Sequence, residues 1–459
     1  MGKESFYVVT LGCAKNIVDS ESMAQLMAGS GYLYAESPET ANVMIVNTCG
    51  FIGPAKDESL KVLDELAAQK RPDQVLIAAG CLTQRYGIEI ANQVRGIDGI
   101  LGTRRWMDIV SVVQQLRDGH HPEPLYHLPN TATVGSDERG AYRVAIQGAS
   151  AYIKIADGCR RPCAFCAIPL IKGTAVSRPI DAILDEARYL RDLGIREIIL
   201  IAQDTTDYGH DLGIRNGLAL LLEKLVSAVP DVDWLRVMYA YPGYVTEPLI
   251  EVMASHQQVL TYLDMPLQHA HSAVLRRMRR PSNVDWVYRT LESMRQAMPN
   301  LALRTTFIVG YPGETEVEFQ TLLDFIRTIR FDRVGAFQFS FEAGTSSEAL
   351  GDPIPAEIKT SRWEQLMGLQ RQISLERNQS FIGKQLDVLI EGQGFLEDEQ
   401  GEQSGEQISL GRSYRDAPEI DGMVIVEGAV PIGDIVRVGI NGAMVYDLSA
   451  KLVSSINEG

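Results

Sequence analysis

The hydrophobic pattern of the first 118 residues predicts parallel strands alternating with helices. Three short apolar runs, which contain β-branched residues and end near a glycine, lie at residues 7–11, 43–46 and 75–79. Residues 19–29 and 54–69 fall between these runs and are expected to be helical from the spacing of their apolar residues. Strands connected through helices pair in parallel, so residues 1–118 predict an N-terminal α/β domain.

Residues 149–375 repeat this alternation, which predicts a second α/β domain. Six apolar runs predict strands at residues 151–156, 197–202, 234–239, 261–266, 301–309 and 333–339. Helical patterns such as 180–193 and 218–229 separate them. Six β/α units predict a partial or complete barrel, with its chemistry on the loops that follow the strands. A doubly wound open sheet is the alternative.

The stretch 119–148 has no clear period and is rich in proline and glycine. This composition predicts a linker between the two α/β domains. An extended insertion packed on one of its neighbours is the alternative, and both remain open at this point.

After Asn378 the pattern changes to short strands separated by glycine-rich turns. The strands are expected at residues 386–390, 423–426, 434–439 and 444–446, with no convincing helix between them. This spacing predicts a small all-β barrel of the OB-like kind over residues 376–449.

Composition narrows the class of protein. With 459 residues, of which 45% are hydrophobic and 22% charged, the chain is expected to be globular, and disordered chains and small disulfide scaffolds are excluded. The sequence has no apolar run of about 18 residues and no signal-peptide pattern at its start, so we expect a cytoplasmic protein without a membrane span. In that compartment cysteines are more often metal ligands or catalytic thiols than disulfides.

Charge is distributed unevenly along the chain. The net charge is −16, and residues 376–459 contain 15 acidic and 6 basic residues, a net charge of −9. Phosphate binding requires clustered Lys and Arg, so the acidity argues against RNA binding. A basic protein partner is compatible with it.

Three of the six cysteines lie on one short loop. Cys159, Cys163 and Cys166 follow the strand predicted at 151–156. Ordinary ferredoxin clusters use four cysteines, so three thiolates around a [4Fe-4S] cluster would leave one iron open to a small molecule. A zinc site is the alternative, but zinc would require a fourth ligand and usually shows paired CxxC units.

The other three cysteines, Cys13, Cys49 and Cys81, each stand just beyond one strand of the N-terminal domain. Parallel strands bring their carboxyl ends to one edge of the sheet, so we expect these thiols to converge although they are far apart in sequence. They predict a second three-thiolate cluster. The alternative is that each is an ordinary buried free cysteine.

Over nearly its whole length the sequence resembles the radical S-adenosylmethionine (SAM) methylthiotransferases. The order of an N-terminal domain with three dispersed cysteines, a radical SAM core and a C-terminal TRAM domain is similar to that of the family. Several motifs resemble the RimO branch, which modifies an aspartate of small-subunit ribosomal protein twelve: LGCAKN at 11–16, VNTCGF at 46–51, AQDTTDYG at 202–209, PLQHA at 266–270, FIVGYPGE at 307–314 and APEIDG at 417–422. Ala14 departs from the proline that is common there in the family.

This resemblance implies a mechanism. SAM would bind the open iron held by Cys159, Cys163 and Cys166 and, after reduction by a flavodoxin or ferredoxin, would yield a 5′-deoxyadenosyl radical that abstracts hydrogen from the β-carbon of the target aspartate. A second [4Fe-4S] cluster on the N-terminal cysteines would hold the sulfur, and a second SAM would supply the methyl group. Both clusters must then face one cavity.

Contacts to SAM are expected from the core cysteine loop and the ends of the core strands. The candidate residues are Phe165, Gln203, Arg304 and Gly310. Four arginines end the helical stretch 272–278, and we expect them to cap this helix rather than to bind RNA. They are Arg276, Arg277, Arg279 and Arg280.

Two other functions remain as alternatives. A tRNA adenosine methylthiotransferase would use the same chemistry, but the acidic C-terminal domain argues against RNA as substrate. A non-catalytic iron–sulfur electron carrier would need neither the three-cysteine loop nor a core of six β/α units.

Overall fold

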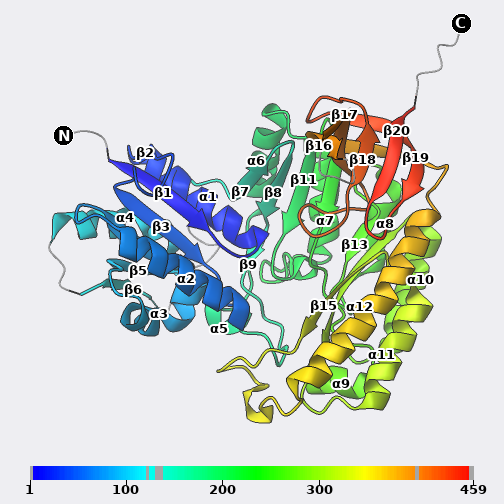
Figure 1. The fold of residues 1–459 in the computed structure, drawn as a ribbon, viewed down its shortest axis with the longest axis horizontal. Coiled ribbons are helices and arrows are strands. Elements are labelled where there is room, and N and C mark those ends of the chain that lie inside the picture. Colours follow the sequence, from blue (N-terminus) through cyan, green and yellow to red (C-terminus); the bar gives the residue numbers. More distant parts are fainter. Residues whose placement is uncertain (1–3, 120–122, 130–137, 398–402, 454–459) are drawn as a thin grey trace, which may run out of the picture.

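A computed structural model describes residues 4–119, 123–129, 138–397 and 403–453 of the chain. Figure 1 shows an N-terminal domain in blue, a core in green to yellow and a small strand-rich domain in orange and red that lies against the core. None of the described helices is long and apolar enough to cross a membrane.

The N-terminal domain is built around one parallel sheet with the strand order β2-β1-β3-β4-β5-β6. The strands are β1 (Ser5–Thr10), β2 (Leu33–Tyr34), β3 (Val43–Thr48), β4 (Val75–Gly80), β5 (Gly99–Gly102) and β6 (Leu125–His127). The helices that connect them are α1 (Ala14–Gly29), α2 (Gly53–Gln69), α3 (Cys81–Gln93) and α4 (Ile109–Asp118). β3 and β4 are buried along their whole length, as expected for central strands covered on both faces. The predicted α/β domain is confirmed.

The core contains the six predicted parallel strands. They are β8 (Ser150–Lys154), β11 (Glu197–Ile201), β12 (Trp234–Val237), β13 (Tyr262–Asp264), β14 (Ala302–Val309) and β15 (Arg333–Gln338). They form the sheets β12-β11-β8 and β13-β14-β15, and a bridge between Leu235 and Val259 joins the two. Because the strands follow one another in space as they do in sequence, the core is a partial barrel and the doubly wound alternative is wrong.

Helices pack against the core strands and bury one large apolar cluster. They are α6 (Ile180–Asp192), α7 (Gly217–Ala228), α8 (Glu247–Ser255), α10 (Val284–Ala297), α11 (Glu316–Ile329) and the long α12 (Ala356–Gln379). In Figure 1, α12 runs along α11 and ends beside the strand-rich domain. The helices predicted at 180–193 and 218–229 are confirmed.

The stretch predicted as a linker contributes a strand to each neighbour. β6 extends the N-terminal sheet, and β7 (Val144–Gln147) pairs antiparallel with β8 at the edge of the core. Residues 120–122 and 130–137 of this stretch lie outside the described residues. The domain boundaries themselves stay predictions.

The C-terminal domain is a closed barrel with the order β16-β17-β18-β20-β19. Its strands are β16 (Gln385–Glu397), β17 (Gln403–Ser413), β18 (Val424–Glu427), β19 (Ile435–Ala443) and β20 (Leu448–Leu452). The predicted barrel is confirmed, but the strand expected at 444–446 is wrong, because Met444 and Asp447 close a turn before β20. β17 was not predicted from the sequence because glycines interrupt its apolar alternation.

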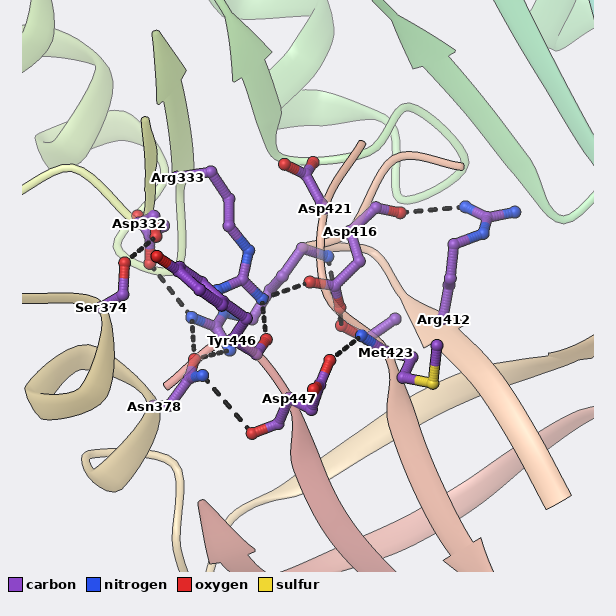
Figure 2. A network of polar contacts seen from close by, with 12 residues as sticks. Asp332, Arg333, Ser374, Asn378, Arg412, Asp416, Asp421, Met423, Tyr446 and Asp447 are labelled. Atoms are coloured by element: carbon purple, nitrogen blue, oxygen red, sulfur yellow. Dashed lines mark hydrogen bonds and ion pairs between the residues drawn. The ribbon is translucent and has the colours of Figure 1, made fainter. Parts of the chain in front are cut away.

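Buried polar contacts hold this barrel on the core (Figure 2). Arg333 at the start of β15 donates to Asp416 at 2.6 Å and to the carbonyl oxygen of Tyr446 at 2.8 Å. Asn378, near the end of α12, donates to the carbonyl oxygen of Met444 at 3.0 Å. These contacts orient the barrel, because an unpaired charge at this buried interface would be unfavourable.

A second buried ion-pair group joins β11 to β17. Glu197 accepts hydrogen bonds from Arg236 at 2.7 Å and from Arg412 at 2.6 Å. Burial alone would raise the pKa of Glu197, but the two guanidinium groups lower it to about 2. The Glu197 carboxylate therefore binds a proton less readily in the folded state than in the unfolded chain.

Acid is expected to weaken this contact. The stabilisation is present above the usual pKa near 4.5 and is lost as the pH falls toward about 2. We expect Glu197→Gln to be less stable than wild type near neutral pH and to lose less unfolding free energy between about pH 5 and pH 3, measured by urea denaturation. The exposed Glu223→Gln should follow wild type. A Glu197→Gln profile parallel to that of wild type would contradict the assignment.

Candidate active site with two cysteine sets

Three cysteines lie at one edge of the N-terminal sheet. Cys49 and Cys81 directly follow β3 and β4, and Cys13 follows β1 after Leu11 and Gly12; the three strands are neighbours in the sheet. Cys13 is exposed, Cys49 is half-buried and Cys81 is buried. A charge on Cys13 acts on the pKa of both other thiols. The structure thus brings the three thiols together, and their ligation of a cluster stays a prediction.

The loop after β1 allows this convergence. Gly12 has a φ of +94°, and a Cβ at this position would lie 2.8 Å from the Cβ of Cys49, so only glycine lets the two loops approach. The buried Asn16 donates to the carbonyl oxygen of Thr48 at 3.1 Å, and its Oδ1 lies 3.5 Å from the Sγ of Cys81. One asparagine therefore holds the loops of all three cysteines in register.

The other three cysteines lie on the loop between β9 (Ala156–Asp157) and α5 (Ile168–Lys172), and they are Cys159, Cys163 and Cys166. Backbone hydrogen bonds fix this loop at both ends: the Cys159 amide donates to Gly173 at 3.0 Å, and the Ala164 amide donates to Met278 at 2.8 Å. All three thiols are half-buried. The Arg161 amide also lies 3.4 Å from the Sγ of Cys159, so the backbone of the loop contacts one of its own thiols.

Burial affects the thiols of both sets. It raises the pKa of Cys81 and of Cys166 to about 12 and the pKa of Cys159 to about 11. A thiol must lose its proton to ligate a metal. These thiols therefore hold their protons more tightly than a free cysteine does, and a bound metal would compensate the charge of the thiolates.

Arg280 contacts the core cysteine loop. Its Nη1 lies 3.3 Å from the Sγ of Cys163, and its guanidinium group lies 4.4 Å from the centre of the Tyr241 ring. The Tyr241 hydroxyl is 3.6 Å from the same sulfur. The prediction that this arginine caps a helix is wrong, because Arg279 takes a left-handed conformation (φ +53°) after α9 (Ser272–Arg277) and the chain turns back toward Cys163.

Two more arginines anchor the opposite side of this loop. Arg161 donates to Asp204 at 2.6 Å, and Arg160 donates to Asp207 at 2.6 Å. The guanidinium group of Arg161 also lies 3.5 Å from the centre of the Tyr244 ring. The acidic residues of the motif at 202–209 therefore position the cysteine loop.

The two cysteine sets lie on facing sides of the contact between the domains. Cys81 packs with Ala167 and Ile171 in one apolar cluster, and Ala167 directly follows Cys166. α3 of the N-terminal domain contacts α5 of the core at the same place. The edge of the parallel sheet thus faces the cysteine loop of the partial barrel.

A buried charge network lies beside this contact. Asp19 on α1 pairs with Arg143, with Lys154 at 2.6 Å and with Lys172 at 2.7 Å. Asp157, just before the core cysteine loop, pairs with the same three cations. Burial alone would raise the pKa of Asp19, but these cations hold it well below its usual range. The network ties α1 to the segment that leads into the core cysteines.

Two of the residues predicted to contact SAM have surroundings that suit a ligand. Gln203 follows β11, is half-buried, and its Oε1 has no hydrogen-bond partner among the described residues. An unpaired buried acceptor is costly, so a ligand donor would stabilise it. Phe165, which lies next to Cys166 in the sequence, packs against the apolar cluster that contains Tyr311. Both contacts stay predictions.

The other two candidates are engaged within the protein. Arg304 pairs with Asp264 at 2.8 Å and lies 3.4 Å from Asp421 of the C-terminal barrel. A Cβ on Gly310 (φ +72°) would lie 2.5 Å from the Cγ of Lys359, so this glycine is required for the approach of α12. Contact of either residue with SAM stays a prediction.

The donor sets suit iron–sulfur clusters better than single ions. Among the described residues, no group of three or more Cys, His, Asp or Glu is arranged to hold a metal ion. Ligands of a cluster bind different irons and lie farther apart than ligands of one ion. Three thiols in each set would leave one ligand position of a four-iron cluster to another molecule, and this ligation stays a prediction.

Sequence reasoning did not identify one further pair of residues. The Nζ of Lys15 lies 3.0 Å from the centre of the Tyr239 ring, although the two belong to different domains. Lys15 is part of the motif at 11–16, and this motif is the sequence feature that could have indicated a role for it. Tyr239 follows β12 and has a φ of +63°, a conformation that no sequence pattern indicated.

Comparisons with known proteins agree with this architecture. Family models match residues 5–102 (Uncharacterized protein family UPF0004), 153–326 (Radical SAM superfamily) and 382–453 (TRAM domain). Among solved structures, the radical SAM methyltransferase TsrM from Kitasatospora setae aligns with a TM-score of 0.55 at 13% identity, covering 85% of this chain and 82% of that chain. This likeness supports the fold alone.

Similarity to curated proteins is much higher. The ribosomal protein uS12 methylthiotransferase RimO of Chloroflexus aurantiacus is 48% identical over 98% of this chain and 100% of its own length. The RimO proteins of Herpetosiphon aurantiacus and Myxococcus xanthus are 46% and 41% identical, each over 98% of this chain, and the matches span 100% and 92% of those proteins. The chain belongs to the RimO family of radical SAM methylthiotransferases.

Proposed function

We propose that this chain transfers a methylthio group to the β-carbon of an aspartate in ribosomal protein uS12. The observation that carries the proposal is the packing of Cys81 against the residue after Cys166. A sulfur donor and a radical source must reach the same carbon atom, so their ligands must lie close together. The names of the relatives support uS12 as the substrate.

The two cysteine sets are the proposed cofactor ligands. A SAM-binding [4Fe-4S] cluster would be held by Cys159, Cys163 and Cys166, and an auxiliary [4Fe-4S] cluster by Cys13, Cys49 and Cys81. When bound, these groups and SAM supply the 5′-deoxyadenosyl radical, the sulfur and the methyl group. Arg280 and Arg161 hold the first loop in place, and Asn16 holds the second set.

Docking of a basic ribosomal protein on the TRAM domain is part of the proposal. The described barrel exposes more carboxylates than cations, namely Asp387, Glu391, Glu406, Glu419, Glu427 and Asp434 against Lys384, Arg437 and Lys451. Such a surface attracts a basic protein and repels RNA. We further expect a flavodoxin- or ferredoxin-type reductant and reaction in the cytoplasm.

The proposal is tested by measuring the mass of uS12 and the composition of tRNA nucleosides in cells that lack this gene. We expect uS12 to lose a methylthio group, and the chain supplied on a plasmid to restore it. A variant with Cys163→Ala serves as the matched control and should fail to restore the mass. Loss of a methylthio group from tRNA alone would refute the substrate and favour the tRNA-modifying alternative.

A further inference from the structure

Lys15 lies between the two cysteine sets. It stands two residues after Cys13 on the first turn of α1, and its Nζ lies over the ring of Tyr239 from the core. Two residues after Tyr239, the Tyr241 hydroxyl contacts the Sγ of Cys163. One short core segment thus touches both Lys15 and a core cysteine.

In the part of the chain that the structure describes, Lys15 has no acidic partner, in contrast to Arg304, Arg161 and Lys172. No carboxylate of the described residues lies within ion-pair distance of its half-buried side chain, and it donates no hydrogen bond within the described chain. The neighbouring cations are all engaged: Arg304 with Asp264, Arg161 with Asp204, Lys172 with Asp19 and Arg280 with Cys163. A cation that is partly removed from water and unpaired is unfavourable unless a ligand supplies the opposite charge.

Tyr239, whose ring lies under Lys15, has an unfavourable backbone conformation. Tyr239 adopts a left-handed backbone, and its amide donates to Asp264 at 3.1 Å. Such a conformation in a bulky residue persists only where the surroundings enforce it, and it is concentrated at functional sites. The lysine is held in place by the ring rather than by a salt bridge.

We propose that the Nζ of Lys15 binds the side-chain carboxylate of the target aspartate. This inference rests on the proposed function. In an aspartate the carboxylate is bonded directly to the β-carbon that reacts. When this carbon lies within reach of both cysteine sets, the negatively charged carboxylate must lie between them as well. Lys15 is the described cation that lies there without a partner. Its contact would orient the β-carbon and select an acidic residue.

A double-substitution experiment tests this contact. Iron-loaded enzyme is mixed with uS12 in the absence of a reductant, and the Kd is measured for the natural target and for a uS12 variant with asparagine in place of the target aspartate. Wild type should bind the aspartate form about 10-fold or more tightly than the asparagine form, and Lys15→Met should bind both equally. The exposed Lys224→Met is the matched control and should keep the wild-type preference.

The outcomes separate this inference from the function on which it rests. Equal binding of both targets by wild type, or a preference that survives in Lys15→Met, overturns the role of Lys15 if wild type still modifies uS12. Failure of wild type to modify uS12 at all refutes the proposed function. Iron content and cluster spectra check the fold, and Lys15→Gln replaces Lys15→Met under the same criterion if the methionine variant loads less iron.

Discussion

Replacing Cys81 by alanine is expected to remove about half of the bound iron and to abolish modification of uS12. With two [4Fe-4S] clusters the wild type should hold about eight irons, and the variant about four. The cysteines of the core loop belong to another domain and keep their own hydrogen bonds. Cleavage of SAM to 5′-deoxyadenosine should therefore survive while transfer of sulfur is lost.

The reciprocal variant serves as the control. Cys163→Ala should also lose about half of the iron, but it should form no 5′-deoxyadenosine, because Cys163 belongs to the set that we propose to bind SAM. Iron content, 5′-deoxyadenosine and the mass of uS12 are measured for both proteins after anaerobic reconstitution, since each readout tests one of the two proposed clusters. Full iron content or normal modification in Cys81→Ala would refute the auxiliary cluster.

The sequence predicted the elements that carry the cysteines because strand ends and ligand edges coincide in parallel sheets. Each of Cys13, Cys49 and Cys81 follows an apolar run, and the strand order places these runs side by side. The same rule located Cys159 after a core strand. Periodicity and connectivity are local signals, so the fold of both α/β domains could be read from them.

Contacts that depend on tertiary packing could not be predicted in this way. Arg280 reaches Cys163 from 117 positions away, and Asp19 reaches Lys154 across 135 positions. The sequence predicts a helix cap for Arg280 because several arginines lie together at the carboxyl end of α9, which is the usual pattern of a cap. The lysine over Tyr239 was missed for the same reason, since the two residues meet only when the domains dock.

Replacing Asp19 by asparagine is expected to lower the free energy of unfolding by about 3–5 kcal/mol. Asp19 is buried and is surrounded by Arg143, Lys154 and Lys172, so the change leaves three cations to share the single carboxylate of Asp157. Asparagine keeps the size of the side chain, and the loss therefore reports charge rather than packing. The free energy is measured by urea denaturation at neutral pH.

An exposed ion pair provides the matched control for this loss. Asp185 pairs with Arg188 at 2.7 Å on the surface of α6, and Asp185→Asn should change stability by less than about 1 kcal/mol because water screens this pair. Equal effects of the two substitutions would contradict a buried network. Asp157 directly precedes the core cysteine loop, and Asp19 lies on the helix that begins after Cys13. Because the two carboxylates share the same cations, Asp19→Asn should also loosen the contact between the cysteine sets. We therefore expect it to reduce modification of uS12 more than Asp185→Asn does.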